Sequence, residues 1–395
     1  MTARLPDSEY ESRLAEIRGK LADADADAAV WFGATSIQYV TGFDHVQTER
    51  PVVLAVTPDR VEITVPRLEV ERVETNPRVD AVHHYFDYPG GAPIETAVEM
   101  LRGLDADSVV ADADGAPGVM GYEGPELSAF VDVETQSWVD RMRWEKTDAE
   151  LDLIRESAEW GNLAHRYLQE YAEAGAHPAT VSQRASMEAS RAMLDTLGDR
   201  FVENVRGDGP AHAGFISAHE TALPHGHTPN QRLREGDVII TGAGADVDGY
   251  HSELERTMFV GDPSDEQVHY FELMLEAQEI AIDAMGPGVP LADVDQAVWD
   301  YYEEQGLTEY AQHHVGHNIG MGGHEPPYID RGWGQAQDDE VDAVMAPGQV
   351  YTIEPGIYVT DREEGYRHSD TIAVTESGVE WFTYYPRDLE SNVVR

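Results

Sequence analysis

Three short segments decide how this chain folds: Gly249-Tyr250-His251-Ser252-Glu253-Leu254-Glu255-Arg256-Thr257, Gly316-His317-Asn318-Ile319-Gly320 and Ile353-Glu354-Pro355-Gly356. Together they supply three glutamates and two histidines, side chains that can bind a metal ion or transfer a proton. Convergent titratable groups are typical of a catalytic site, whereas a surface built only for binding has no need of them. The search for function therefore begins in the carboxyl-terminal two thirds of the chain.

These segments resemble the catalytic half of the aminopeptidase P/prolidase/creatinase superfamily. The resemblance extends over most of residues 140–395 and implies a pita-bread fold there. A further stretch, Ser36-Ile37-Gln38-Tyr39-Val40-Thr41-Gly42-Phe43, resembles a signature from the small amino-terminal domain of the creatinase family. We therefore predict an α+β protein in which a creatinase-like N-terminal α/β domain spans residues 1–140. A pita-bread catalytic domain is expected over residues 141–395.

Local patterns predict elements that agree with this organisation. A capping box, Thr147-Asp148-Ala149-Glu150, begins a helix at the start of the second domain. Apolar spacing and turn residues predict two further helices, over 265–285 and 292–305. Strands are expected at 28–32, 52–56, 61–65, 237–241, 255–260, 350–353 and 371–374. In the second domain, helices, strands, helices and strands follow one another, as two α+β halves would require.

The resemblance also raises the question of a metal centre. In metal-dependent members of the superfamily, two aspartates, one histidine and two glutamates surround a pair of divalent ions, and their positions fall here on Gly242, Glu253, His317, Glu354 and Ser369. Two dications about 3.5 to 4 Å apart repel each other and need shared anionic ligands, which glycine and serine do not provide. We therefore predict no obligatory metal cofactor. A single manganese, cobalt or zinc ion on Glu253, His317 and Glu354 stays open as an alternative.

Creatinase resembles this chain in lacking the metals, and its leucine-glutamate-arginine-threonine run is matched by Leu254-Glu255-Arg256-Thr257. In creatinase, that glutamate and the one in the glutamate-proline motif hold a cationic guanidinium, and the two positions fall on Glu255 and Glu354. Two carboxylates that converge on one pocket need a cation between them or a proton on one of them. We expect the substrate to bring that cation.

The histidines complete the expected site. His225 matches the catalytic histidine of creatinase, and an imidazole with a pKa of about 6.5 suits proton transfer at neutral pH. A purely structural role for His225 is the alternative. The expected catalytic set is His225, Glu255 and Glu354. By resemblance, the substrate-binding candidates are His317, His324, Tyr250, His251 and Tyr328, although Tyr250 can equally pack behind the site.

These residues predict a hydrolase that cleaves a C–N bond in a small nitrogen-rich compound, an amidine, a guanidino compound or an amide, without an obligatory metal. The arginine that clamps the carboxylate of creatine falls on Tyr328, so the pattern argues against creatine itself. Two alternatives stay open. One is a metal-dependent Xaa-Pro aminopeptidase or dipeptidase, and the other is a pita-bread module that binds peptides without catalysis.

The composition indicates the kind of cell in which the protein works and the partners it can bind. The chain has 75 acidic and 27 basic residues, a formal net charge of −48, which is typical of proteins from salt-adapted cells. In strong salt the screening length falls to roughly 3 Å at 1 M, so self-repulsion costs little. The same charge disfavours nucleic acids and anionic membranes as partners. With no cysteine and no long apolar run, we expect a cytoplasmic protein that acts on a small-molecule substrate. The family resemblance implies a homodimer.

Overall fold

The computed structural model describes residues 4–87, 90–115, 122–204, 209–228, 230–332 and 343–395. These residues form two compact units, Pro6–Arg143 and Trp144–Arg395, the second of which also includes Leu5. Among the residues described, no helix combines the length and the apolar character needed to cross a membrane.

The first unit contains short strands and helices that alternate along the chain. In chain order they are α1 (Asp7–Ala24), β1 (Ala28–Trp31), α2 (Ala34–Thr41), β2 (Val53–Val56), β3 (Val61–Pro66), α3 (Val70–Val73), β4 (Ala81–Tyr85), α4 (Pro93–Gly103), β5 (Ser108–Ala111), β6 (Asp132–Thr135) and α5 (Trp138–Met142). Strands β1, β2 and β3 confirm the first three strands expected from the sequence. The signature-like stretch from Ser36 to Phe43 lies mostly on α2.

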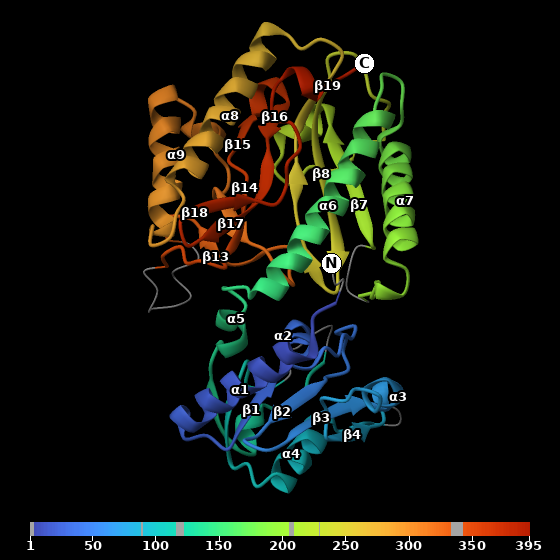
Figure 1. The fold of residues 1–395 in the computed structure, drawn as a ribbon, viewed down its shortest axis with the longest axis vertical. Helices are drawn as coiled ribbons and strands as arrows, with labels where there is room; N and C mark the ends of the chain where they lie inside the picture. Colours follow the sequence, from blue (N-terminus) through green and yellow to red (C-terminus); the bar gives the residue numbers. More distant parts are fainter. Residues whose placement is uncertain (1–3, 88–89, 116–121, 205–208, 229, 333–342) are drawn as a thin grey trace. The chain divides into compact units, whose positions relative to one another are not determined.

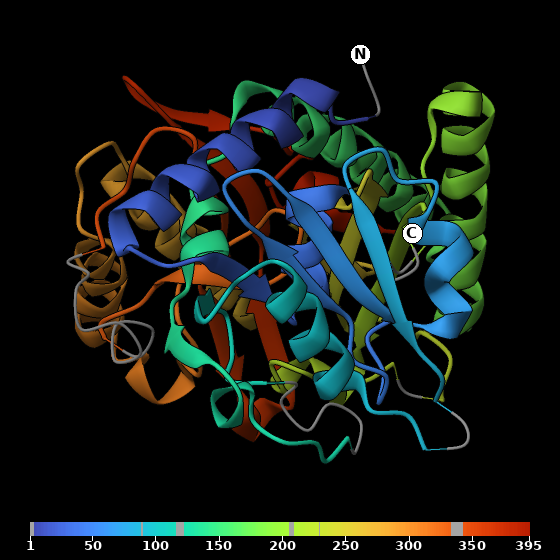
Figure 2. The ribbon, with the colours of Figure 1, turned by 90° about the horizontal axis from the view of Figure 1, so that it is seen from below.

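A six-stranded mixed sheet in the order β4-β3-β2-β1-β5-β6 forms the centre of this unit. Strand β1 pairs antiparallel with β2 and parallel with β5. Helix α4 packs its apolar side, including Ile94 and Leu101, against Val30 and Val53 of the sheet, and Figure 2 shows α4 beside the strands. The unit therefore has a core of its own, as an α/β domain requires.

The second unit is larger. Its elements are α6 (Asp148–Tyr171), α7 (Pro178–Leu197), β7 (Ala211–Ser217), β8 (Val238–Val247), β9 (Tyr250–His251), β10 (Leu254–Glu255), β11 (Thr257–Val260), α8 (Asp265–Ala284), α9 (Leu291–Gln305), β12 (Gly316–Asn318), β13 (Glu325–Ile329), β14 (Val350–Ile353), β15 (Gly356–Val359), β16 (Glu364–Arg367), β17 (Ser369–Thr375), β18 (Gly378–Trp381) and β19 (Val393–Val394).

Helix α6 begins where the capping box places it. The Thr147 hydroxyl accepts a hydrogen bond from the Glu150 backbone N–H, and the Glu150 carboxylate accepts one from the Thr147 N–H. Helix α7 follows without having been expected. Two of its buried residues, Ala185 and Ala189, are small and add little to the apolar signal.

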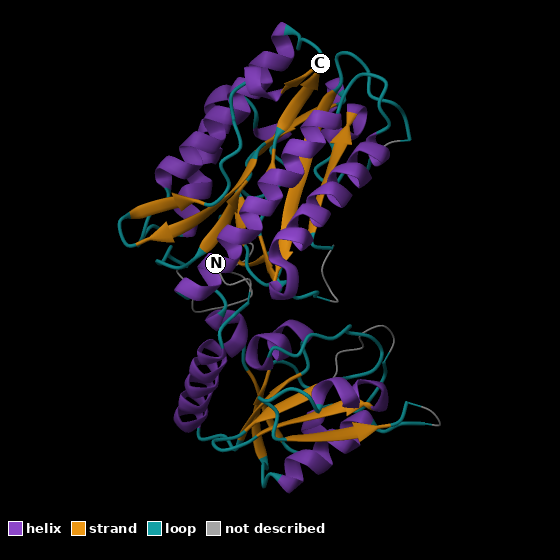
Figure 3. Ribbon diagram, turned by 45° about the vertical axis from the view of Figure 1, so that its right-hand side comes forward, coloured by secondary structure: helices purple, strands orange, loops and turns teal. Residues whose placement is uncertain are grey.

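Two helix-and-strand halves build the second unit, as the order of elements predicts. One large sheet runs in the order β13-β12-β14-β17-β10-β8-β11-β19, with β7 and β9 added on β8 and β18 on β17. Helices α6 and α7 pack beside β7 and β8. Helix α8 packs against β14, β15 and β16, and α9 packs against β13 (Figures 1 and 3). Strands β12, β14, β17 and β10 therefore lie side by side, although they come from both halves of the sequence.

Candidate active site

A cavity of about 1170 Å³ opens in the second unit. Six residues expected at the site line it: His225, Glu253, Glu255, His317, His324 and Glu354. The sheet order explains their convergence. Glu253 and Glu255 lie at β10, His317 lies on β12, and Glu354 directly follows β14. The sheet order β12-β14-β17-β10 brings these separate segments of the sequence together.

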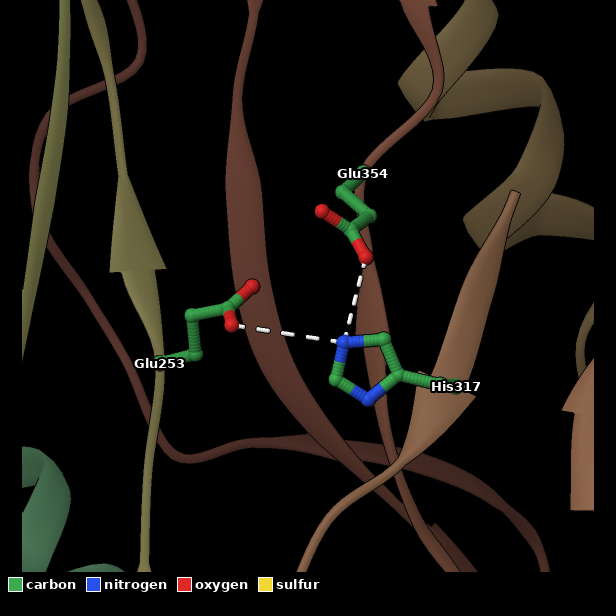
Figure 4. A group of neighbouring side chains, drawn as sticks. All are labelled: Glu253, His317 and Glu354. Atoms are coloured by element: carbon green, nitrogen blue, oxygen red, sulfur yellow. Dashed lines mark ion pairs between the residues drawn. The ribbon is translucent and has the colours of Figure 1, made fainter. Parts of the chain in front are cut away.

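Glu253, His317 and Glu354 form a compact group of potential metal ligands (Figure 4). The Nε2 atom of His317 lies 3.2 Å from Oε1 of Glu354 and 4.0 Å from Oε2 of Glu253. One ligand atom from each residue lies within 4.8 Å of the other two. The Nδ1 atom of His317 donates to the Asn318 carbonyl at 3.1 Å, so Nε2 of the neutral ring is the atom free to bind a cation.

The charges in this group interact strongly. Burial lowers the pKa of His317, but the hydrogen bond with Glu354 and the negative charges of Glu253 and Glu354 overcome that effect and raise the pKa of His317 to about 9. Burial raises the pKa of Glu354, but the hydrogen bond and charge of His317, with Arg367, hold it well below its usual range. Burial and the charges of Glu354 and Glu255 raise the pKa of Glu253. A dication would relieve this crowding of carboxylates.

Glu255 already has a cationic partner. The Arg367 guanidinium donates to both carboxylate oxygens of Glu255, at 2.5 and 2.7 Å, and lies 3.9 Å from Oε2 of Glu354. Both oxygens of Glu255 bind an arginine of the protein itself, so the expectation that Glu255 holds a cationic substrate stays a prediction. Arg367 provides the positive charge that was assigned to the ligand.

Arg367 is held in place by further contacts. It donates to the Tyr358 hydroxyl at 2.9 Å and to the Pro224 carbonyl at 3.1 Å, and Pro224 directly precedes His225. Tyr358 in turn donates to Nε2 of His313 at 2.8 Å. Because Nδ1 of His313 donates to the His314 carbonyl at 2.7 Å, Nε2 is the acceptor in that ring. Sequence reasoning missed this chain of hydrogen bonds, because its members lie on separate strands and share no local motif.

Gly242 and Ser369 stand where metal-dependent relatives have carboxylates, and each lies next to a glutamate of the site. A Cβ atom on Gly242 would lie 3.9 Å from Oε1 of Glu255, so the Glu255 carboxylate stands over the glycine. The Ser369 hydroxyl donates to Oε1 of Glu253 at 2.7 Å. Among the described residues, one donor set with the spacing of a metal site remains, and it suits one ion. Glu255, a further carboxylate of the cavity wall, is bound by Arg367.

His324 lies against His317, with ring centroids 3.8 Å apart. Burial and the positive charges of His317 and His314 lower the pKa of His324 to about 4, so its ring is neutral at pH 7 and can donate or accept a hydrogen bond. His314, which also lines the cavity, contacts His324 edge-on at 5.6 Å. His225 and the neighbouring Pro224 line the same cavity.

Three expected substrate-binding residues do not line the cavity. Tyr250 is buried, and its hydroxyl donates to the Glu150 carboxylate on α6 at 2.7 Å, which makes it a packing residue. His251 lies on the short strand β9, where its N–H donates to the Gly320 carbonyl at 2.8 Å. Tyr328 packs against His324 and His314, with ring centroids 5.5 and 5.6 Å apart, and both histidines line the cavity. Their assignment to substrate binding is therefore corrected.

Arg256 lies behind the site and carries no exposed surface. Its guanidinium pairs with Asp370 at 2.8 Å and donates to the carbonyls of Glu255 and Ser369 at 2.6 and 3.0 Å. Strands β10 and β17, which carry these residues, are thereby joined beneath the cavity. Arg256 positions the backbone of Glu255, and not its carboxylate.

Comparison with known proteins agrees with this site. The model of metallopeptidase family M24 matches residues 152–376, and the creatinase/prolidase N-terminal domain matches residues 13–143. The chain belongs to metallopeptidase family M24. It is similar to a probable dipeptidase PepE of Mycobacterium tuberculosis, with 28% identity over 396 residues and 98% of each chain covered. It is also similar to an Xaa-Pro dipeptidase of Pyrococcus furiosus, with 37% identity over 175 residues, 44% of this chain and 48% of that protein.

Solved structures of M24 proteins share the fold. A dipeptidase PepE from Mycobacterium ulcerans covers 99% of both chains with 25% identity and a TM-score of 0.79. An Xaa-Pro dipeptidase from Bacillus anthracis covers 96% of this chain and 99% of its own, with 23% identity and a TM-score of 0.78. The pita-bread fold and the N-terminal domain are thus confirmed, and the chain is a hydrolase of C–N bonds. These relatives carry peptidase names, so the creatinase-like subtype is not supported.

Proposed function

We propose that this M24 protein is a dipeptidase that hydrolyses the peptide C–N bond of short substrates, Xaa-Pro dipeptides first among them, with one divalent ion held by Glu253, His317 and Glu354. Manganese, cobalt and zinc all suit a donor set of one imidazole and two carboxylates. The observation that carries the proposal is the convergence of these three side chains on the cavity. The peptidase names of the full-length relatives support the same reaction.

When bound, the ion would supply Lewis acidity for the scissile carbonyl and for water. His225 moves a proton between water and the leaving nitrogen, because its imidazole lines the cavity and can both accept and donate a proton. His324 donates a hydrogen bond to the oxygen on which negative charge develops, as its neutral ring and its place against His317 allow. Glu255 and Arg367 act as positioning residues.

Arg367 contributes in two ways. Its pair with Glu255 adds no net charge to the cavity, so the single ion faces only Glu253 and Glu354 as anionic ligands. Its hydrogen bond to the Pro224 carbonyl fixes the backbone directly before His225. Loss of Arg367 is therefore expected to disturb both ion binding and proton transfer.

The test is an assay of the purified protein in high salt. The chain is stripped with a chelator, reloaded with manganese, cobalt or zinc, and offered Ala-Pro and Ala-Ala. Hydrolysis that appears on reloading and disappears on chelation supports the proposal. Hydrolysis that is indifferent to the chelator, or the absence of hydrolysis with every metal and dipeptide, contradicts it.

Two variants separate the roles. His317→Ala removes a ligand and should abolish both ion binding and turnover. His225→Ala should keep the ion while turnover falls by roughly 10²- to 10⁴-fold, the range found for general acid–base groups. His269→Ala is the matched control, because His269 is an exposed histidine on α8 that does not line the cavity. If the chain is instead a binding module, His225→Ala should bind ligand as the wild type does, and neither the wild type nor any variant should hydrolyse a dipeptide.

A further inference from the structure

One buried basic residue behind the cavity has no part in the proposed chemistry. Only two of the 27 basic residues of the chain are lysines, Lys20 and Lys146. Lys20 lies on α1 and pairs with Glu16, and 36% of its side chain is exposed. Lys146 is buried and does not line the cavity. Because lysine is rarely buried unless polar partners accept its hydrogen bonds, the contacts of Lys146 indicate what it does.

Lys146 holds the side chain of Asn318 on strand β12. Its Nζ atom donates to Oδ1 of Asn318 and, at 3.4 Å, to the Trp144 carbonyl. Nδ2 of Asn318 donates to the same carbonyl at 3.3 Å. The backbone N–H of Lys146 donates to the Gly348 carbonyl at 2.9 Å, which anchors the segment. Both polar atoms of the fully buried Asn318 side chain are therefore bound by residues 144–146.

Asn318 needs this support because the sheet is irregular beside it. His317 is opposite Tyr328 on β13, whereas Asn318 is opposite Glu325, so the register shifts between the two neighbours. The extra residues of β13, at 326–327, are both prolines and have no N–H to donate. The ladder between β12 and β13 is thus interrupted at the histidine that faces the cavity. Irregularities of this kind re-aim side chains next to active sites.

The orientation of His317 depends on the position of Asn318. The backbone N–H of His317 donates to the Thr352 hydroxyl at 3.2 Å, and its Nδ1 donates to the Asn318 carbonyl at 3.1 Å. The ring is therefore oriented by the backbone of the residue that Lys146 holds. A shift of Asn318 would turn Nε2 of His317 away from Glu354, which lies 3.2 Å from it. Partners that orient a ligand in this way strongly affect metal affinity.

The end of Lys146 also lies beside the segment that carries His324. A Cβ atom on Gly320 would lie 2.9 Å from Cε and 3.3 Å from Nζ of Lys146, and 3.3 Å from Oε2 of Glu325. Glu325 is buried and directly follows His324, and its Oε1 accepts from the Gly322 N–H. Lys146 therefore lies next to the sequence neighbours of both stacked histidines of the cavity.

We propose that Lys146 is a positioning residue, which through Asn318 and Glu325 holds His317 and His324 in their stacked arrangement. The effect on turnover rests on the proposed function, whereas the effect on ion binding requires no turnover. Arginine should not replace Lys146, because its planar group is larger than an amino group and the end of Lys146 is packed against Gly320 and Asn318.

Three measurements on Lys146→Met test the proposal. Competition with a fluorescent chelator, at constant pH and salt, should show manganese bound roughly 10- to 100-fold more weakly, the range found when an outer partner of a metal ligand is lost. At saturating metal, kcat for Ala-Pro should fall by about 10-fold while KM changes by less than about threefold. The visible spectrum of the cobalt-loaded protein should differ from that of wild type, because the ligand geometry changes. Lys146→Arg should not restore any of these properties.

Control variants separate positioning from a general loss of stability. Lys20→Met removes the exposed lysine and should behave as wild type. Met274→Ala removes a buried core side chain of α8, so it should lower the thermal midpoint and leave manganese affinity unchanged. Lys146→Met is repeated with Glu325→Gln, in case the buried carboxylate prevents folding, and Glu325→Gln alone provides the background.

A second pair of variants keeps the lysine. In Gly320→Ala the added Cβ would lie 2.9 Å from Cε of Lys146 and should displace it, with a loss of manganese affinity in the same direction. Gly323→Ala is the matched control, because an added Cβ there would meet no described atom within 4 Å.

The outcomes distinguish this proposal from the proposed function. If no metal-loaded protein hydrolyses a dipeptide but Lys146→Met and Gly320→Ala bind manganese more weakly, the proposed function fails and positioning by Lys146 stands. If dipeptides are hydrolysed but both variants match wild type in affinity, kcat and cobalt spectrum, positioning is refuted. A loss of affinity in Met274→Ala as large as that in Lys146→Met refutes it too. A wild type that binds none of the ions refutes both proposals.

Discussion

Binding of the ion should depend steeply on pH, because His317 must lose a proton before Nε2 can coordinate a metal. Burial lowers the pKa of His317, yet Glu354 and Glu253 raise it to about 9 in the metal-free protein. With that pKa, roughly 1% of the rings are neutral at pH 7 and about half are neutral at pH 9. The apparent affinity for manganese should therefore rise roughly 50-fold over this interval.

The affinity increases with pH because a proton and the metal ion compete for Nε2 of His317. Below the pKa the proton occupies the nitrogen that the ion needs, so affinity increases as pH increases. Glu253 adds to the same trend, because its pKa is also raised. A histidine with an ordinary pKa of about 6.5 would change the affinity by only about 1.3-fold between pH 7 and pH 9.

The assay is competition with a fluorescent chelator at pH 7, 8 and 9, under argon and at constant salt. Calorimetry in buffers of different ionisation enthalpy should detect the release of about one proton or more per ion at pH 7. In Glu354→Gln the pKa of His317 should fall, since its hydrogen-bonded carboxylate is lost, and the dependence should flatten. An affinity that changes by less than about threefold in wild type would refute the assigned charge state of this group.

Three further predictions concern stability. Arg256→Met removes the cation paired with buried Asp370 at 2.8 Å and leaves only the Arg387 guanidinium, 4.0 Å from its other oxygen. The second unit should therefore lose about 3 to 5 kcal/mol and its thermal midpoint should fall by roughly 10 °C, less in Arg256→Lys; an unchanged midpoint would count against the buried pair. Burial raises the pKa of Asp112 to about 6, so its contribution to stability is lost as pH rises through 6. Between pH 4 and pH 7, wild type should lose roughly 2 to 3 kcal/mol relative to Asp112→Asn in urea unfolding, and parallel curves would contradict this. With a net charge of −48, the unfolding midpoint should rise between 0.1 M and 2 M KCl, and a flat response would contradict the salt-adapted interpretation.

Much of the fold could be predicted because its signals are local. The capping box at Thr147 fixes the start of α6, and the apolar run from Val350 to Ile353 is strand β14 itself. Helix α7 was missed, and two of its buried residues, Ala185 and Ala189, have small side chains that give little periodic signal.

The site was predicted in part. Residues that belong to short motifs, such as Glu253, His317 and Glu354, do converge on the cavity. What the sequence could not provide is the pairing of side chains across strands. Glu255 and Arg367 are 112 positions apart, and nothing local shows that one neutralises the other. The inference of a cationic substrate assumed that the cavity contains no cation of its own, whereas Arg367 lines it.

Several expectations stay predictions. These are the homodimer, the cytoplasmic location and the exclusion of nucleic acids and membranes as partners, all of which follow from composition or from family resemblance. The position where creatinase has its carboxylate-binding arginine is Tyr328, and Arg331 lies three residues beyond it, too far for the spacing to match. The contacts of Arg331 with Trp299 and Asp295 are visible only in the folded chain.

Counting ions and turnover in the same samples tests the single-ion dipeptidase most directly. Metal-free protein is titrated with manganese while bound ions per chain and the rate of Ala-Pro hydrolysis are both recorded. The expected result is a rate that rises in proportion to occupancy and reaches its plateau at one ion per chain. A plateau at two ions per chain, or full activity with no ion bound, would contradict the site formed by Glu253, His317 and Glu354.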